Sequence, residues 1–371
     1  MTKKLNKTKT TNEMPALRRL APSVLAALSA NKTIAGALAS LLLISQASAA
    51  LFTFSTGNPD GKIATLSRPA SPNKLQTETA DDFLVTQPIV INQATFTGLV
   101  PAGTSLSDIS GVEVELYHVF PGDSANPPSG NVVTRSNSPA DVEISSATRD
   151  STSGSLAFSA SVVSASFSAS NSVVNGINKH PNEKTLGEGP VSGEEVSITV
   201  TFNPPIALPA NHYFFRPEVL VNNGDFLWLS APRPIIAPGT PFVGDLQSWI
   251  RNDALAPDWL RVGSDITGQG PFNAAFSLSG ETDADQDGVA DSLDQCPGTP
   301  PGDIVDADGC SIDQLAPCSG PVSGGIWKNH GQYVSTVSKV TEAFLALGLI
   351  TEDQADAIVS EAARSSCGSK K

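Results

Sequence analysis

The chain has 371 residues, of which 23 are basic and 37 acidic, so its formal net charge is −14 at pH 7. This acidic balance excludes a nucleic-acid partner bound through phosphate contacts, because such binding needs a basic surface. The length allows a sizeable core, and the uneven distribution of charge divides the chain into segments.

Residues 1–49 form a separate compositional block that predicts an export signal. They hold seven of the basic residues and a single acid, Glu13. The apolar run 33–45 is too short to span a bilayer, and Ala47-Ser48-Ala49 has the small residues of a cleavage site before Ala50. We expect cleavage there, which leaves no membrane span and a secreted, extracellular product; the periplasm and the cell surface are the alternatives. Met14 is an alternative start, and an uncleaved anchor is the alternative fate.

Residues 50–280 alternate apolar and polar side chains in short runs between Gly, Pro, Asn and Ser, which is typical of half-buried antiparallel strands. The clearest runs are 112–120, 196–202 and 272–278. Val162-Val163 breaks the alternation of 155–170 and predicts a β-bulge. The sequence therefore predicts a mainly β fold, with one antiparallel β-sandwich of jelly-roll type over 50–280.

No catalytic motif occurs in this segment, because neither G-x-S-x-G nor H-E-x-x-H is present. Glu113 and Glu115 lie two residues apart and so share one face of a strand, but solvent-facing glutamates are the commoner explanation of such a pair. Three tryptophans can be read either as core residues or as a stacking platform for a glycan, since aromatic faces suit sugars. They are Trp228, Trp249 and Trp259.

Residues 281–317 are predicted to bind calcium. The span 281–313 has ten acidic residues and no basic ones, so its carboxylates repel one another unless a cation offsets them. Carboxylates at positions 1, 3, 5, 9 and 12, Gly at 6 and a backbone carbonyl at 7 form a twelve-residue calcium loop. These positions are occupied by Asp283, Asp285, Asp287, Gly288, Val289, Asp291 and Asp294. A solvated acidic linker is the alternative.

The loop departs from the helix-flanked calcium sensor in two ways. Position 12 is Asp rather than Glu, and the preceding segment is predicted to be strand and linker. A sensor is therefore not expected.

All four cysteines lie in the last quarter of the chain, and an even number in an exported protein favours disulfides. Three pairings are possible. We favour Cys296 with Cys310 and Cys318 with Cys367, which close loops worth roughly 3 and 4 kcal/mol. Zinc is not favoured, because the spacing contains no C-x-x-C pair.

Residues 318–371 are predicted to form a small helical hairpin. Apolar residues recur at three- and four-residue steps from Tyr333 to Leu347, and Gly348 is placed to end that helix. Thr351 and Gln354 then fit a capping box that starts a second helix. A pair this small has little core, so a disulfide between Cys318 and Cys367 would join its ends.

The span from Asp283 through Cys296-Pro297 to Asp306, Asp308 and Cys310 resembles a bacterial thrombospondin type 3 repeat, as found in linkers of OmpA-like proteins. The resemblance implies calcium binding by the Asp ladder and a disulfide that ties the following loop. It extends the metal ligands to a second, less complete ladder of Asp303, Asp306 and Asp308. The segment from Glu78 to Gly280 resembles a β-rich domain, without assigned function, of secreted proteins that in some cases bear a PEP-CTERM signal.

These features lead to the hypothesis of a secreted, non-enzymatic protein of interaction or adhesion type. Calcium would stiffen a spacer between a sandwich that recognises an extracellular glycan or protein and a helical tail. The alternatives are a secreted carbohydrate-active enzyme whose catalytic acids are unrecognised and a structural surface or matrix protein.

Overall fold

The computed structural model describes residues 50–122, 132–177, 184–232 and 246–369. The predicted export signal, residues 1–49, lies outside the described residues. Within the described ranges, no helix is long and apolar enough to cross a membrane.

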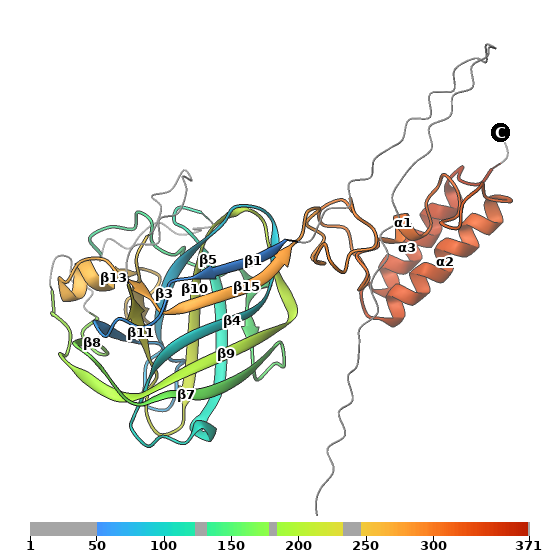
Figure 1. Cartoon of the computed structure of the whole chain (residues 1–371). Helices are drawn as coiled ribbons and strands as arrows, with labels where there is room; N and C mark the ends of the chain where they lie inside the picture. Colours follow the sequence, from blue (N-terminus) through green and yellow to red (C-terminus); the bar gives the residue numbers. More distant parts are fainter. Residues whose placement is uncertain (1–49, 123–131, 178–183, 233–245, 370–371) are drawn as a thin grey trace, which may run out of the picture. The chain divides into compact units, whose positions relative to one another are not determined.

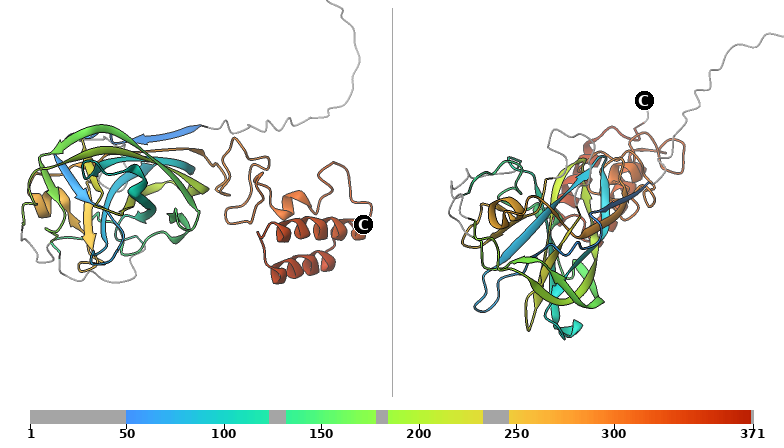
Figure 2. Two further views of the ribbon diagram at one scale, coloured as in Figure 1. Left: turned by 90° about the horizontal axis from the view of Figure 1, so that it is seen from below. Right: turned by 60° about the vertical axis from the view of Figure 1, so that its left-hand side comes forward.

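Two sheets form the β part, and they confirm the predicted mainly β, sandwich-like fold (Figures 1 and 2). The larger sheet has the order β1-β15-β4-β11-β2-β8, with β9 paired to β4, β7 to β9 and β14 to β11. Its strands are β1 (Leu51–Ser55), β2 (Ile63–Leu66), β4 (Ile89–Val100), β7 (Leu156–Ala169), β8 (Asn171–Val173), β9 (Val191–Leu208), β11 (Leu227–Ala231), β14 (Asn273–Ala274) and β15 (Phe276–Thr282).

The smaller sheet has the order β13-β12-β3-β10-β5-β6. Its strands are β3 (Thr77–Val85), β5 (Ile109–His118), β6 (Arg149–Asp150), β10 (Asn211–Val221), β12 (Trp249–Asn252) and β13 (Leu260–Arg261). Short helical turns connect several strands: η1 (Leu106–Asp108), η2 (Ser145–Ala147) and the π-turn η3 (Val262–Thr267).

Every strand pair is antiparallel except β2 and β8, which run parallel. The parallel pairing is possible at this edge because β2 and β8 are connected through a long excursion of the chain rather than a hairpin. The predicted bulge is confirmed: the register of β7 against β9 shifts between Val162 and Ser164 and again before Phe167.

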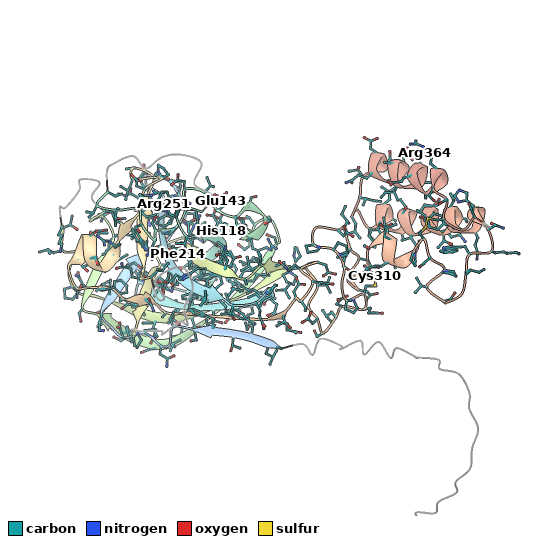
Figure 3. The ribbon with its side chains drawn as sticks, turned by 90° about the horizontal axis from the view of Figure 1, so that it is seen from above. His118, Glu143, Phe214, Arg251, Cys310 and Arg364 are labelled. Atoms are coloured by element: carbon teal, nitrogen blue, oxygen red, sulfur yellow. A yellow bond between two sulfur atoms is a disulfide. The ribbon has the colours of Figure 1, made fainter. Side chains whose placement is uncertain are left out.

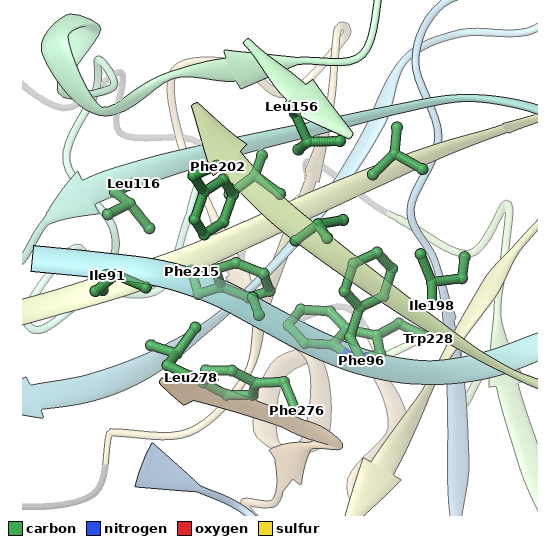
Figure 4. Packing of buried hydrophobic residues seen from close by; sticks show 14 of the residues in the cluster. Ile91, Phe96, Leu116, Leu156, Ile198, Phe202, Phe215, Trp228, Phe276 and Leu278 are labelled. Atoms are coloured by element: carbon green, nitrogen blue, oxygen red, sulfur yellow. The ribbon is translucent and has the colours of Figure 1, made fainter. Parts of the chain in front are cut away.

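The inward faces of both sheets pack into one aromatic core. Phe215 of β10 stacks on Phe276 of β15 with ring centroids 5.1 Å apart, and Phe96 of β4 meets Phe226 edge to face at 5.7 Å. Figure 4 shows how Phe96, Phe215 and Phe276 surround Trp228. Because side chains alternate along each strand, these rings point inward and their polar neighbours point outward. The packing of the inward rings holds the two sheets against each other.

The three tryptophans offer no stacking platform. Trp228, Trp249 and Trp259 are each exposed by 1% or less. Trp228 belongs to the core between the sheets, and its Nε1 donates to the Ala275 carbonyl oxygen at 2.9 Å. Trp249 and Trp259 lie in a second cluster with Phe214 and Tyr117 on the other face of the smaller sheet. The glycan-platform hypothesis for these residues is therefore wrong, because burial removes the aromatic faces that a sugar would need.

After β15 the chain forms an irregular loop that the first disulfide closes. Cys296 is bonded to Cys310, which Figure 3 labels, and Cys318 is bonded to Cys367, so the favoured pairing is confirmed. The short helix α1 (Ile312–Leu315) follows, with a capping box between Ser311 and Gln314. Gln314 also donates through Nε2 to the Cys296 carbonyl oxygen at 3.0 Å, which ties the loop to the start of the helical region.

The predicted helical hairpin is present as α2 (His330–Ala346) and α3 (Glu352–Arg364). Gly348 follows α2 with a left-handed φ of +72°, and the Thr351–Gln354 capping box starts α3 as predicted. The hairpin core includes Ile312 and Ala316 from the preceding segment. The acidic loop and the hairpin are therefore packed together by side chains on both sides of residue 317.

Candidate functional site

Three carboxylates of the predicted calcium loop lie together. Asp283, Asp285 and Asp287 each offer one oxygen, and these oxygens all lie within 4.8 Å of one another. Asp283 directly follows the last residue of β15, so the sheet anchors the first ligand, and its side chain is 1% exposed. The chain turns tightly after Asp283, and this turn brings the three odd-spaced carboxylates to one side, as the sequence predicted.

Backbone amides hold the loop in this shape. Asp283 accepts hydrogen bonds from the amides of Gln286 at 2.9 Å and Gly288 at 3.1 Å, which closes a tight turn. Gly288 has a φ of +93°, a conformation in which a side chain is strained, and this explains the glycine at position 6. Asp285 accepts from the amides of Gly298 and Thr299 at 2.7 and 2.8 Å, so it also fixes the turn after the first cysteine.

Asp287 has an oxygen that nothing satisfies among the described residues. Its Oδ1 accepts from the Val289 amide at 2.8 Å, whereas its Oδ2 is buried without a hydrogen-bond partner. Burial, with the nearby carboxylates of Asp285 and Asp294, raises the pKa of Asp287 to about 6. A buried oxygen that faces other carboxylates costs free energy unless a cation neutralises it. The donor set therefore fits a hard divalent cation that prefers oxygen ligands.

The other predicted ligands of the first ladder serve mainly to build the loop. Asp291 accepts from the Ala284 amide at 2.8 Å and from the Thr282 hydroxyl at 2.5 Å, so it fastens the loop to the end of β15. Asp294 accepts from the Cys296 amide at 2.7 Å. Its carboxylate and that of Asp287 approach Gly309, where a Cβ atom would clash with Asp294. The two halves of the repeat thus meet at a residue that has to be glycine.

The second ladder does not form a comparable group. Asp306 Oδ1 accepts from the amides of Asp308 and Cys310, both at 3.0 Å, and so stabilises its own turn. Asp308 Oδ1 accepts from Gln295 Nε2 at 2.9 Å. Within the described ranges, Asp303, Asp306 and Asp308 do not meet as a set of three ligand oxygens.

A charged cluster on the outer face of the smaller sheet was not anticipated. Arg216 of β10 is 1% exposed and lies among carboxylates from three strands. Its Nη1 lies 2.8 Å from Glu218 and 3.3 Å from Glu113, and its Nη2 lies 2.9 Å from Glu78. Glu115 pairs with the same Nη2, and Arg251 of β12 pairs with Glu78.

Glu113 and Glu115 share one face, as predicted, but the expectation that they face solvent is wrong. Their side chains are exposed by 29% and 13%, respectively, and both contact Arg216. Glu115 also accepts a hydrogen bond of 2.6 Å from the Tyr117 hydroxyl. Spacing on one strand could not reveal this, because the arginine that pairs with both comes from β10, about a hundred residues away.

Four carboxylates around two guanidiniums leave an excess of negative charge in a covered place. Such an excess favours proton uptake, and the pKa values of two of the four acids are raised accordingly. Burial raises the pKa of Glu113 to about 7, and burial together with Glu78 raises that of Glu218 to about 8 in spite of Arg216. In contrast, the two arginines hold the pKa of Glu78 below its usual value although burial opposes this.

The raised pKa of Glu218 predicts a loss of stability as pH rises. An ordinary glutamate titrates near 4.3, so between about pH 4.3 and 8 the folded state holds a proton that the unfolded state has released. The stability that this proton supplies is complete below the lower value and disappears as pH rises through the upper one. At constant calcium, we expect the urea midpoint of the wild type to fall between pH 5 and pH 8.5, and that of Glu218→Gln to fall less.

The matched control is Glu143→Gln, which removes one carboxylate at an exposed position without a described partner. It should keep the wild-type slope of urea midpoint against pH. Identical slopes for Glu218→Gln and the wild type would contradict this assignment of the proton.

Comparison with known proteins adds one short similarity. No family model matches the chain, and no solved structure matches it. Over 54 residues the chain is 46% identical to a protein named alpha-agarase from Thalassotalea agarivorans. These residues are 15% of this chain and only 3% of that protein, so the similarity concerns a small segment of a much longer molecule.

Proposed function

We propose that this protein is a secreted, calcium-binding interaction protein in which calcium stiffens the acidic loop between a β-sandwich that recognises an extracellular ligand and a disulfide-closed helical hairpin. The observation that carries the proposal is the set of Asp283, Asp285 and Asp287 oxygens within 4.8 Å, held by backbone amides around Gly288. The resemblance to thrombospondin type 3 repeats supports calcium as the ion. Two disulfides, with no free cysteine among the described residues, are consistent with an extracellular place.

A binding role is favoured over an enzymatic one for the sandwich. The acids that spacing singles out, Glu113 and Glu115, are already paired with Arg216. A general acid or nucleophile must instead reach the substrate by a direct hydrogen bond or through one water. The match to an alpha-agarase suggests agarose as one polysaccharide to test as a ligand, and it transfers no activity to this chain.

Removal of calcium is expected to loosen residues 281–313. Without the ion, the ladder carboxylates repel one another and the buried Asp287 oxygen loses its compensation, so the loop opens more often. Limited proteolysis should cut this segment faster in EDTA than in millimolar calcium, the range in which extracellular calcium modules bind. Isothermal titration with calcium and with magnesium should identify the preferred ion.

Two variants make this experiment specific. Asp287→Asn should cleave quickly even with calcium, whereas Asp356→Asn, which removes an exposed carboxylate of α3, should behave as the wild type. A wild-type digestion pattern that is the same with and without EDTA would contradict the calcium proposal.

A further inference from the structure

The outward face of the larger sheet carries an ordered array of small hydroxyl side chains. The strand registers align Ser55 with Ser277, Ser277 with Thr95, Thr95 with Thr199, and Thr199 with Ser159. One row of hydroxyls therefore crosses β1, β15, β4, β9 and β7. Side chains opposite one another on paired strands are about 5 Å apart, and the Thr95 and Thr199 hydroxyls are hydrogen-bonded at 3.1 Å.

A groove of about 500 Å³ lies across these same strands, a size suited to a ligand of a few rings. Its lining includes the hydroxyls of Ser55, Thr95, Thr97, Ser197 and Ser277. Among the described residues, no lysine or arginine lines it. The groove is therefore chemically suited to a neutral partner that is rich in hydroxyl groups.

Glu195 is the one ionisable side chain in the groove lining, and it has no partner in the described part of the chain. It is only 6% exposed, yet its carboxylate takes part in no described hydrogen bond or ion pair. Burial raises the pKa of Glu195, as expected for a carboxyl group that lacks compensating donors. The Glu195 oxygens are not among the buried polar atoms that lack a partner, so they are open to the groove, where they can accept hydrogen bonds from two neighbouring hydroxyls of a ligand.

The bulge of β7 shapes the rim next to Glu195. Along β7, the five steps from Val162 to Phe167 face only three steps of β9, from Val196 to Gly193, so β7 has two extra residues here. Val163 within the bulge and Phe167 at its end both line the groove. Bulges commonly re-aim side chains at binding sites, and an aromatic ring beside hydroxyl groups suits the apolar face of a sugar ring.

We propose that this groove binds a neutral polysaccharide, with Glu195 accepting hydrogen bonds from sugar hydroxyls and Phe167 contacting a ring face. The inference rests on the proposed recognition function and names its ligand class and its site. It differs from the tryptophan hypothesis in place and chemistry, because the ligand lies on the polar face of the larger sheet. Because the described part of the groove lining holds no basic residue, a neutral polysaccharide is favoured over an anionic one.

The test is affinity electrophoresis of the calcium-loaded full-length protein through gels that contain agarose, glucomannan or dextran as neutral polymers, or alginate as an anionic one. We expect retardation by at least one neutral polymer and none by alginate. Glu195→Gln should weaken that binding roughly ten- to a hundredfold, as for the loss of charge-assisted hydrogen bonds. Thr97→Val, which removes a groove hydroxyl at nearly constant shape, should weaken it about three- to tenfold.

Stability serves as the internal check. Because the Glu195 side chain takes part in no described hydrogen bond or ion pair, Glu195→Gln should leave the melting temperature unchanged while binding falls, and a merely structural role would lower both. Glu143→Gln, away from the groove, should change neither. If both groove variants bind the polymer as tightly as the wild type, the groove is not the binding site. The proposed recognition function would then have to use another surface. No retardation by any neutral polymer, or retardation by alginate alone, would overturn the ligand class, and the proteolysis experiment would still decide the calcium proposal independently.

Discussion

Replacement of Arg216 by methionine should lower the free energy of unfolding of the sandwich by about 3–5 kcal/mol, the usual cost of removing one partner from a buried ion cluster. The Arg216 side chain is 1% exposed and contacts Glu78, Glu113, Glu115 and Glu218. Without it, Arg251 is the one cation left beside them among the described residues, and the partly buried carboxylates repel one another. The change would consume a large part of a typical folding free energy of about 5–15 kcal/mol. Urea unfolding monitored by tryptophan fluorescence measures it directly.

Lys62→Met is the matched control, because Lys62 also pairs with a carboxylate, Asp60, but its side chain is 63% exposed. Surface pairs of this kind contribute about 0–1 kcal/mol. If charge repulsion causes the loss, the stability difference between Arg216→Met and the wild type should be smaller at pH 5, because more of the unpaired acids are protonated there. A loss below about 1 kcal/mol at neutral pH, or a deficit that does not change with pH, would show that Arg216 is not the electrostatic centre of this face.

Removal of the Cys318–Cys367 disulfide should open the helical hairpin while the sandwich stays folded. The bond spans 49 residues, and closing such a loop stabilises the folded state by about 4 kcal/mol. The hairpin has only two small clusters, around Val337 and Phe344, so it cannot absorb that loss. In Cys318→Ser/Cys367→Ser, backbone amides of α2 and α3 should exchange hydrogen on the order of a thousandfold faster.

The amides of β4 and β10 provide the internal reference, since the sandwich has its own core and should exchange at wild-type rates. A matched variant, Cys296→Ser/Cys310→Ser, removes a bond that spans 14 residues and should loosen the acidic loop more than the helices. If α2 and α3 keep wild-type protection in Cys318→Ser/Cys367→Ser, helix packing rather than the disulfide maintains the hairpin.

The sequence by itself determined the features that short segments encode. The Thr351–Gln354 capping box and Gly348 placed the helix ends of the hairpin because capping needs only residues three or four apart. The spacing of Asp283, Asp285 and Asp287 around Gly288 brought three carboxylates together for the same reason, since a tight turn is a local structure. The alternation of apolar and polar residues predicted strands, and the break at Val162-Val163 predicted the bulge.

Only the tertiary structure decided which surfaces these strands expose and what each polar residue meets. Glu113 and Glu115 were expected to be solvated because Arg216, which pairs with both, comes from a strand far away in sequence. The sequence left open whether the three tryptophans are core residues or a glycan-stacking platform. The strand order buries Trp228, Trp249 and Trp259 beneath other elements. No sequence motif marks Glu195. It became a candidate because the structure places it, without a described partner, in a groove that five strands line. Strand order, pairing register and burial depend on contacts between residues a hundred or more positions apart, and local patterns carry little information about those contacts.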